Sequence, residues 1–124
     1  KALECHGTGT ALGDPIEVGA IKTVFGDASR DAPNMFLCAG KSNHGHLEGA
    51  AGFAGLIKVF GCLQHHEVPP NLHYQKLNPH ISLDSSRLAI PETKTKLPTK
   101  DNTVMGVSSF GFGGTNAHAV LQHS

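Results

Sequence analysis

The fold is decided by residues 35–64, which read MFLCAGKSNHGHLEGAAGFAGLIKVFGCLQ. The first five residues form a short, continuous apolar run, which is typical of a β-strand buried on both faces. Apolar residues between 46 and 64 lie nearly all round a helix, which predicts a central, buried helix. Glycines thin one side of its first half and favour close packing there. A buried strand that leads through a polar loop into a buried helix predicts a layered α/β sheet.

A second helix is expected over residues 15–25. Asp14 is a suitable cap, and Pro15 is favoured at the first helical position. The side of this helix expected to pack inward carries Ile16, Gly19, Ala20 and Val24.

Strands are expected elsewhere in the chain. Residues 1–5 are typical of the end of a strand, while 104–108 and 117–121 predict two strands of a hairpin. Residues 65–97 are interrupted by prolines and predict an extended surface excursion. Polar loops are expected at 27–34 and 94–100. The first and last elements would leave unpaired strand edges, so we expect the chain to be part of a larger body.

Composition narrows the class of protein. The 124 residues suffice for one domain, and 39% of them are apolar. The net charge is zero, which gives no electrostatic reason to expect nucleic acid or an anionic membrane as partner. The longest apolar stretch, 49–63, contains Lys58 and is too short to span a bilayer, and we expect no signal peptide.

Cysteine and histidine usage gives two further expectations. The three cysteines are an odd number without CxxC spacing, so we expect no disulfide framework and a reducing, cytoplasmic location. The nine histidines lack the i, i+4 pairing of a helical zinc site, so no metal is expected.

Three glycine-rich stretches carry polar side chains. His6 lies in the first, at 5–10; His44 and His46 lie in the second, at 41–48; the third is 109–116. Flanking glycines let backbone and ligand approach closely, so the loops together indicate a polar active site. No obvious nucleophile accompanies them, since Cys5 at a buried strand end is expected to be an inert small apolar residue. The third stretch lacks the Lys-Ser/Thr ending of a P-loop, which argues against nucleotide binding.

The chain resembles the β-ketoacyl synthase family, in detail the ketosynthase domains of type I polyketide synthases. The stretches that carry the resemblance are 4–10, 13–17, 41–52, 68–73 and 109–119. The resemblance implies a thiolase-like α/β fold with two similar halves in five layers. Residues 1–124 resemble only the C-terminal half, and the nucleophilic cysteine of the family would lie in an N-terminal half outside this chain.

The resemblance implies a decarboxylative Claisen condensation of acyl and malonyl-type thioesters in polyketide or fatty acid biosynthesis. His6 and His46 match the two active-site histidines of the family, whose donors would stabilise the oxyanion formed during decarboxylation. Lys41 matches the active-site lysine. In bacterial single-domain relatives a glutamate pairs with this lysine, but Gly55 stands at that position, so the partner of Lys41 is left open. His44 departs from the usual aliphatic residue.

The resemblance also implies how the ligand is held. Thr8 and Thr10 match threonines that bind the phosphopantetheine arm of an acyl carrier protein, although the same residues could serve only to stabilise a turn. Phe112 matches a gatekeeping phenylalanine whose backbone N–H joins an oxyanion hole, while Phe110 is expected in the core. The implied partners are the carrier protein, the N-terminal half and a second copy in a homodimer. No resident cofactor is implied.

Two alternatives remain at this point. An upstream glutamine in place of the cysteine would give a domain that only decarboxylates malonyl chains. A scaffold or dimerisation module would use the same surface without chemistry. As the C-terminal half of a condensing enzyme, the fragment alone is expected to be inactive, because the nucleophile is absent.

Overall fold

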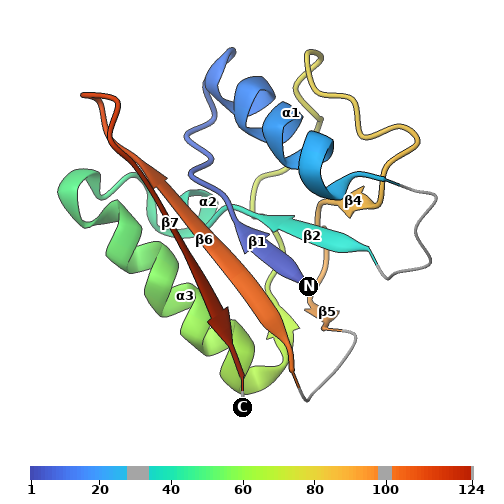
Figure 1. Ribbon diagram of the computed structural model, residues 1–124, viewed down its shortest axis with the longest axis vertical. Helices are drawn as coiled ribbons and strands as arrows, with labels where there is room; N and C mark the ends of the chain where they lie inside the picture. Colours follow the sequence, from blue (N-terminus) through green and yellow to red (C-terminus); the bar gives the residue numbers. More distant parts are fainter. Residues whose placement is uncertain (28–33, 98–101, 124) are drawn as a thin grey trace.

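The computed structural model describes residues 1–27, 34–97 and 102–123. A five-stranded sheet runs through it in the order β4-β2-β1-β6-β7 (Figure 1). Its strands are β1 (Ala2–Glu4), β2 (Met35–Cys38), β4 (Leu88–Ala89), β6 (Val104–Phe110) and β7 (Asn116–Gln122). β1 pairs in parallel with both β2 and β6, β2 pairs in parallel with β4, and β7 is antiparallel to β6. The predicted hairpin and its two strands are therefore confirmed.

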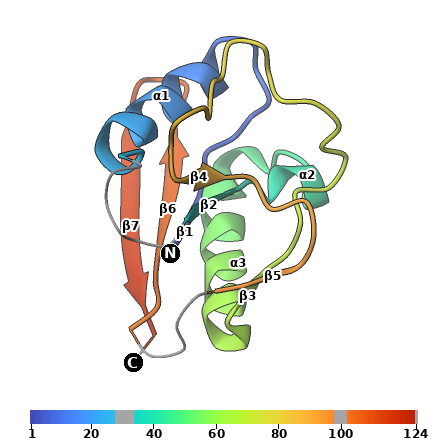
Figure 2. The ribbon, with the colours of Figure 1, turned by 90° about the vertical axis from the view of Figure 1, so that its right-hand side faces the viewer.

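Helices cover both faces of this sheet, as Figures 1 and 2 show. Helix α3 (Ala51–His65) packs on one face and α1 (Gly13–Phe25) on the other. Each face has its own apolar cluster, because successive strand residues point to opposite sides of a sheet. In β1, Ala2 belongs to the cluster under α3, whereas Leu3 belongs to the cluster under α1. The layered α/β architecture is thus confirmed.

Helix α1 begins earlier than predicted and packs a different side. Leu12 is its N-cap, so Pro15 is its third residue, and the carboxylate of Asp14 accepts a hydrogen bond from the Gly9 N–H at 3.1 Å instead of capping the helix. The predicted inward side is wrong: Ile16 and Val24 are 74% and 60% exposed, and Gly19 and Ala20 are exposed as well. Glu17 and Ile21 are buried in their place, since the Glu17 carboxylate is turned inward to bind the loop that follows β1.

The long helix also differs from its prediction at its start. The prediction began it near His46, whereas α3 begins at Ala51 after a 3-10 turn, η1 (Glu48–Ala50). Gly45 and Glu48 have positive φ angles of 78° and 47°, which are incompatible with an α-helix. A short helix that was not predicted, α2 (Lys41–His44), precedes this bend.

Within this chain, α3 is buried on one face only. Val59 and Cys62 pack against the sheet, with exposed fractions of 0% and 4%. The opposite face carries Phe53, Ile57 and Phe60, which are 71%, 68% and 56% exposed. The prediction of a buried helix is therefore wrong within this chain, although the helix is apolar nearly all round.

The excursion after α3 has more regular structure than expected. β3 (Glu67–Val68) pairs antiparallel with β5 (Thr95–Lys96), and β4 extends the main sheet. The polar loop expected over 94–100 is thus wrong at β5, and its residues 98–100 lie outside the described part of the chain, as do 28–33 of the loop expected over 27–34. Among the described residues, no helix is both long enough and apolar enough to cross a membrane.

Gly106 in β6 offers a test of this packing. A Cβ atom there would lie 2.5 Å from Leu3 Cδ1 and 2.9 Å from His118 Cε1. We expect Gly106→Ala to lower the free energy of unfolding by about 1–3 kcal/mol, because a buried leucine must move. Thermal unfolding of the purified protein measures the loss. Gly19→Ala adds the same methyl group where no atom lies within 4 Å, and it should cause no loss; equal losses in both variants would contradict the assigned packing.

Candidate active site

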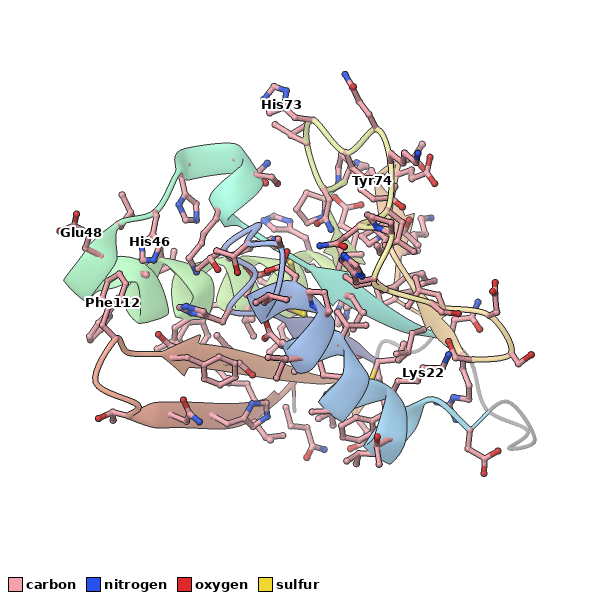
Figure 3. The ribbon with its side chains drawn as sticks, turned by 90° about the horizontal axis from the view of Figure 1, so that it is seen from above. Lys22, His46, Glu48, His73, Tyr74 and Phe112 are labelled. Atoms are coloured by element: carbon pink, nitrogen blue, oxygen red, sulfur yellow. The ribbon has the colours of Figure 1, made fainter. Side chains whose placement is uncertain are left out.

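The three predicted loops meet at one edge of the sheet. β1, β2 and β6 are parallel, so the loops that follow Glu4, Cys38 and Phe110 leave the sheet at the same edge. The carboxyl ends of parallel strands are where ligand sites in α/β folds form. Figure 3 shows His46 and Phe112, which come from two different loops, at the same end of the molecule.

His6 lies inside this group, with its ring held on two sides. Its ring centroid lies 6.0 Å from that of His46, at an interplanar angle of 85°, and 5.2 Å from that of Phe110. The Phe110 backbone N–H donates a hydrogen bond to His6 Nδ1 at 3.2 Å. In a neutral imidazole the other nitrogen must then carry the proton. His6 therefore presents an Nε2–H donor.

His46 has the same arrangement. The Glu48 backbone N–H donates to His46 Nδ1 at 2.9 Å, which again leaves the proton of the neutral ring on Nε2. The 3-10 turn supplies this donor, since it brings Glu48 back toward the ring two residues before it. Glu48 thus contributes a backbone group to the site rather than a partner for Lys41. The two predicted histidines are brought together, and each presents an Nε2–H donor when its ring is neutral.

The charge state of His6 favours this role. Burial of the ring, then the positive charge of Lys41 and the neighbouring His46, lower its pKa below the ordinary value of 6.5. The neutral donor form is therefore the stable one at neutral pH. As the pH falls below 6.5, the unfolded chain takes up this proton before the folded chain does, so stability is lost in that range.

A titration tests this assignment. We expect the His6 ring, followed by NMR in the purified protein, to titrate below pH 6.5. Lys41→Met removes a positive charge that disfavours the imidazolium, so the His6 pKa should rise in that variant. A midpoint at or above 6.5 in the unaltered protein, or no rise in the variant, would contradict the assigned electrostatics.

Lys41 joins two of the loops. Its Nζ donates a hydrogen bond to the backbone carbonyl of His6 at 2.5 Å. Burial lowers the Lys41 pKa, and the nearby carboxylates, Glu4 first, oppose that shift. The partner of Lys41 that the sequence left open is therefore a carbonyl oxygen on the histidine loop.

Glu17 holds the His6 loop from the other side. Its Oε1 accepts the His6 N–H at 2.7 Å and its Oε2 accepts the Gly7 N–H at 3.0 Å. Burial raises the Glu17 pKa, and these two hydrogen bonds oppose that rise. A carboxylate of α1 thus fixes the backbone on which the His6 ring stands.

The predicted ligand-binding residues are less closely grouped. Thr10 Oγ1 accepts a hydrogen bond from the Gly13 N–H at 3.0 Å, which is the turn-stabilising alternative. Thr8 lines an open cavity of about 690 Å³ between the His6 loop and residues 71–81, which Lys41 also lines. Phe112 is fully exposed at the tip of the β6–β7 turn, and Phe110 is half-buried against His6 rather than in the core.

The three cysteines are free thiols in the protein interior. Cys38 and Cys62 lie in the core cluster under α3. Burial raises the pKa of Cys38 to about 12 and that of Cys5 well above its usual range, so Cys5 is not an activated nucleophile. In the described ranges no three His, Cys, Asp or Glu side chains are arranged to hold a metal ion.

Sequence reasoning missed two carboxylates and a lysine as members of the site. In the sequence, Glu17 is only the last residue of the stretch 13–17 that resembles the family. No motif predicts that Glu4 and Lys58 form a pair. Lys58 Nζ lies 2.8 Å from Glu4 Oε2, and both side chains are nearly buried. For Glu4 and Lys58 the sequence held a signal, because each is the one Asp, Glu, Lys or Arg in a largely apolar strand or helix, and buried charges need a partner.

Sequence profiles of known families match almost the whole chain. The profile described as "Beta-ketoacyl synthase, C-terminal domain" matches residues 1–75, and the "Ketoacyl-synthetase C-terminal extension" matches 78–124. The chain is 46% identical over 121 residues to the hybrid PKS-NRPS synthetase pynA of Aspergillus niger. The matched region is 96% of this chain and 3% of that protein. It is 46% identical over 120 residues to the highly reducing polyketide synthase curS1 of Aspergillus terreus, covering 97% and 5%. The chain thus spans a small part of these relatives.

Solved ketosynthases share the fold. Ketosynthase twelve of the bacillaene polyketide synthase in Bacillus amyloliquefaciens superposes with a TM-score of 0.89 at 40% identity, over 99% of this chain and 22% of that chain. The ketosynthase from module 6 of the bacillaene synthase of Bacillus subtilis 168 superposes with a TM-score of 0.90 at 37% identity, over 100% and 22%. The chain therefore belongs to the β-ketoacyl synthase family, and it has the thiolase-like α/β fold of the C-terminal part of a ketosynthase.

Proposed function

We propose that this chain supplies the decarboxylating half of a ketosynthase active site in a polyketide or fatty acid synthase. His6 and His46 are its catalytic residues, and the Lys41 ammonium holds the His6 loop through a hydrogen bond to the backbone carbonyl of His6. The observation that carries the proposal is a shared pair of hydrogen bonds: each ring accepts a backbone N–H at Nδ1, so each neutral ring offers Nε2–H as a donor.

The chemistry follows from those two donors. A malonyl-type thioester loses carbon dioxide when its C–C bond breaks and the electron pair moves into an enolate. Negative charge then develops on the thioester oxygen, and two neutral N–H donors aimed at it lower the barrier without first giving up a proton. The enolate carbon attacks an acyl thioester on a cysteine, a C–C bond forms, and the thiolate leaves.

The nucleophile of this reaction belongs to another part of the domain in our proposal. The chain matches 22% of the length of a solved ketosynthase. Its own Cys5 thiol is buried, and burial raises the pKa of this thiol. The uncovered apolar face of α3 and the exposed Ile16 and Val24 of α1 form surfaces of the kind that another part of a protein covers. We assign residues 1–124 to the C-terminal portion of the domain and expect an N-terminal portion to cover these faces.

The substrate is proposed to arrive on the phosphopantetheine arm of an acyl carrier protein. Thr8 stands on the cavity beside Lys41, and Phe112 is exposed on the hairpin next to the histidine loops, so both are positioned to meet an arm that enters from outside. Thr10 is proposed only as part of the turn that presents Thr8. A homodimeric parent protein and a reducing, cytoplasmic setting complete the proposal, and the three free thiols are compatible with that setting.

The first experiment is intact mass analysis of the full-length protein after incubation with an acyl-carrier thioester. A stable acyl adduct on a peptide outside residues 1–124 is the expected result. An adduct-free protein that still decarboxylates malonyl-carrier would favour the decarboxylase alternative, and a protein with neither signal would favour the scaffold.

A further inference from the structure

Glu4, the last residue of β1, and Lys58 of α3 form a buried charged pair. Glu4 is 3% exposed, and the other two residues of β1 are apolar. Lys58 on α3 faces it from the helix, with 2.8 Å between Lys58 Nζ and Glu4 Oε2. The side chain of Glu4 is 5% exposed and that of Lys58 is 13% exposed. Neither group belongs to the catalytic residues proposed above.

The second oxygen of Glu4 binds the backbone of the lysine turn. Oε1 accepts the N–H of Gly40 at 2.5 Å, and Gly40 is the N-cap of α2, immediately before Lys41. Two glycines, Gly40 and Gly55, leave room for the Glu4 side chain. A Cβ atom at Gly40 would lie 3.0 Å from Glu4 Oε1, and one at Gly55 would lie 3.3 Å from Glu4 Cγ. Glu4 therefore sits in a gap that these two glycines leave open, and its two oxygens have different partners.

Glu4 and Lys41 complete a closed path around the site. Glu4 binds Gly40, Lys41 follows Gly40, and the Lys41 ammonium binds the carbonyl of His6, which lies two residues after Glu4 in the chain. A shift of the Gly40 turn would therefore move the Lys41 ammonium and the His6 backbone together.

Stability alone does not account for this pair. Burying two charges carries a desolvation cost that their attraction often fails to exceed, so a well-packed apolar pair would hold β1 and α3 together at least as well. A carboxylate oxygen aimed at the Gly40 N–H does what an apolar side chain could not do, because it fixes the position of one backbone group.

We infer that Glu4 is a positioning residue that sets the Gly40–Lys41 turn, and through it the His6 loop, while Lys58 holds the Glu4 carboxylate in place. This inference rests on the proposed function, since it assigns Glu4 to the decarboxylation that His6 and His46 perform. Glu4 is buried and so is not accessible to substrate in this chain, and its loss should reduce kcat and leave KM unchanged.

Two double variants isolate the Gly40 hydrogen bond. Glu4→Gln with Lys58→Met and Glu4→Met with Lys58→Met both remove the same two charges. They differ at the end of one side chain of similar size, a carboxamide in the first and a thioether in the second, and only the carboxamide oxygen can accept the Gly40 N–H once Lys58 is gone. In the full-length protein we expect the methionine pair to decarboxylate malonyl-carrier with kcat about 10- to 100-fold below the glutamine pair. KM should be the same in both.

The partly exposed pair of Lys94 and Glu67 is the control. Its nitrogen and oxygen lie 3.2 Å apart, away from the site, and Lys94 is 70% exposed. Lys94→Met with Glu67→Gln should leave kcat and KM unchanged. Glu4→Asp is a second test that does not depend on the double variants folding. It keeps the charge that faces Lys58 but shortens the reach to Gly40, so the same selective loss of kcat is expected.

The possible results separate the inference from the proposed function. An unaltered protein that does not decarboxylate malonyl-carrier would overturn the proposed function itself. An active unaltered protein with equal kcat in the two double variants, or with unchanged kcat in Glu4→Asp, would overturn only the role of Glu4. A change in KM without a change in kcat would overturn it as well.

Discussion

Replacing His46 with alanine is expected to lower the rate of malonyl-carrier decarboxylation by about 100-fold or more, with little effect on stability. The ring is exposed in this chain, and its one assigned hydrogen bond within the chain is the one that Nδ1 accepts from Glu48. The loss would therefore come from the missing Nε2–H donor. His6→Ala should show a loss of the same order, because its ring presents the same donor 6.0 Å away, centroid to centroid. Single-turnover release of carbon dioxide from the full-length protein measures both.

His44→Ala is the control for these two variants. His44 lies two residues before His46 in the same loop and is also exposed, but its Nδ1 faces the Gly45 carbonyl at 2.9 Å, so this nitrogen carries the proton when the ring is neutral. We expect its removal to leave decarboxylation unchanged. Undiminished turnover in both His6→Ala and His46→Ala would remove the catalytic assignment, and an equal loss in His44→Ala would point to a general distortion of the loop.

The architecture was predictable wherever one local pattern decided the outcome. The apolar run of residues 35–39 and the hairpin strands near 104–108 and 117–121 were identified because a buried strand and a hairpin leave periodic or continuous apolar signals. The start of α3 was not predictable from apolar periodicity. The apolar pattern gives no sign of a break at Gly45 or Glu48. Their positive φ angles interrupt the helical backbone, so α3 begins only at Ala51.

The sequence pointed to candidate residues for the site but not to the groups that those residues contact. His6, His46 and Lys41 stand in glycine-rich loops, and resemblance to a family pointed to them. Their partners are backbone groups: the N–H of Phe110, the N–H of Glu48 and the carbonyl of His6. Backbone groups carry no signal in the sequence, because every residue has them. The hydrogen bonds from which the two tautomers are inferred are therefore found only in the fold.

The inward side of α1 shows the same limit in another form. Periodicity placed Ile16 and Val24 inward, since apolar residues ordinarily face the core. The helix instead turns Glu17 inward, because two N–H groups of the His6 loop need an acceptor. A polar requirement of the site has overridden the apolar pattern, and Glu17 is the residue at which that requirement can be tested.

Glu17→Gln should lower both stability and activity. The carboxylate accepts one N–H at each oxygen, whereas a carboxamide has one oxygen and one NH₂ group, so either the His6 N–H or the Gly7 N–H would face another donor. Glu17 is 9% exposed, so water cannot readily take the place of the lost bond. We expect a loss of about 1–3 kcal/mol in the free energy of unfolding, which thermal or urea unfolding measures. Decarboxylation should fall about 10- to 100-fold, because the His6 backbone is no longer fixed.

Asp14→Asn provides the comparison that decides what Glu17 does. Asp14 lies on the same helix as Glu17, and one of its oxygens accepts the N–H of Gly9, in the His6 loop, at 3.1 Å. This hydrogen bond is exposed to solvent. An asparagine oxygen can still accept that bond, so neither stability nor decarboxylation should change by more than a small factor. If Glu17→Gln unfolds as the unaltered protein does and retains its rate, then the His6 loop is held by Lys41 and the ring contacts alone. If it loses stability and keeps its rate, the carboxylate supports the fold without positioning His6. Only a joint loss, absent in Asp14→Asn, agrees with a buried acceptor that builds the site from the helix side.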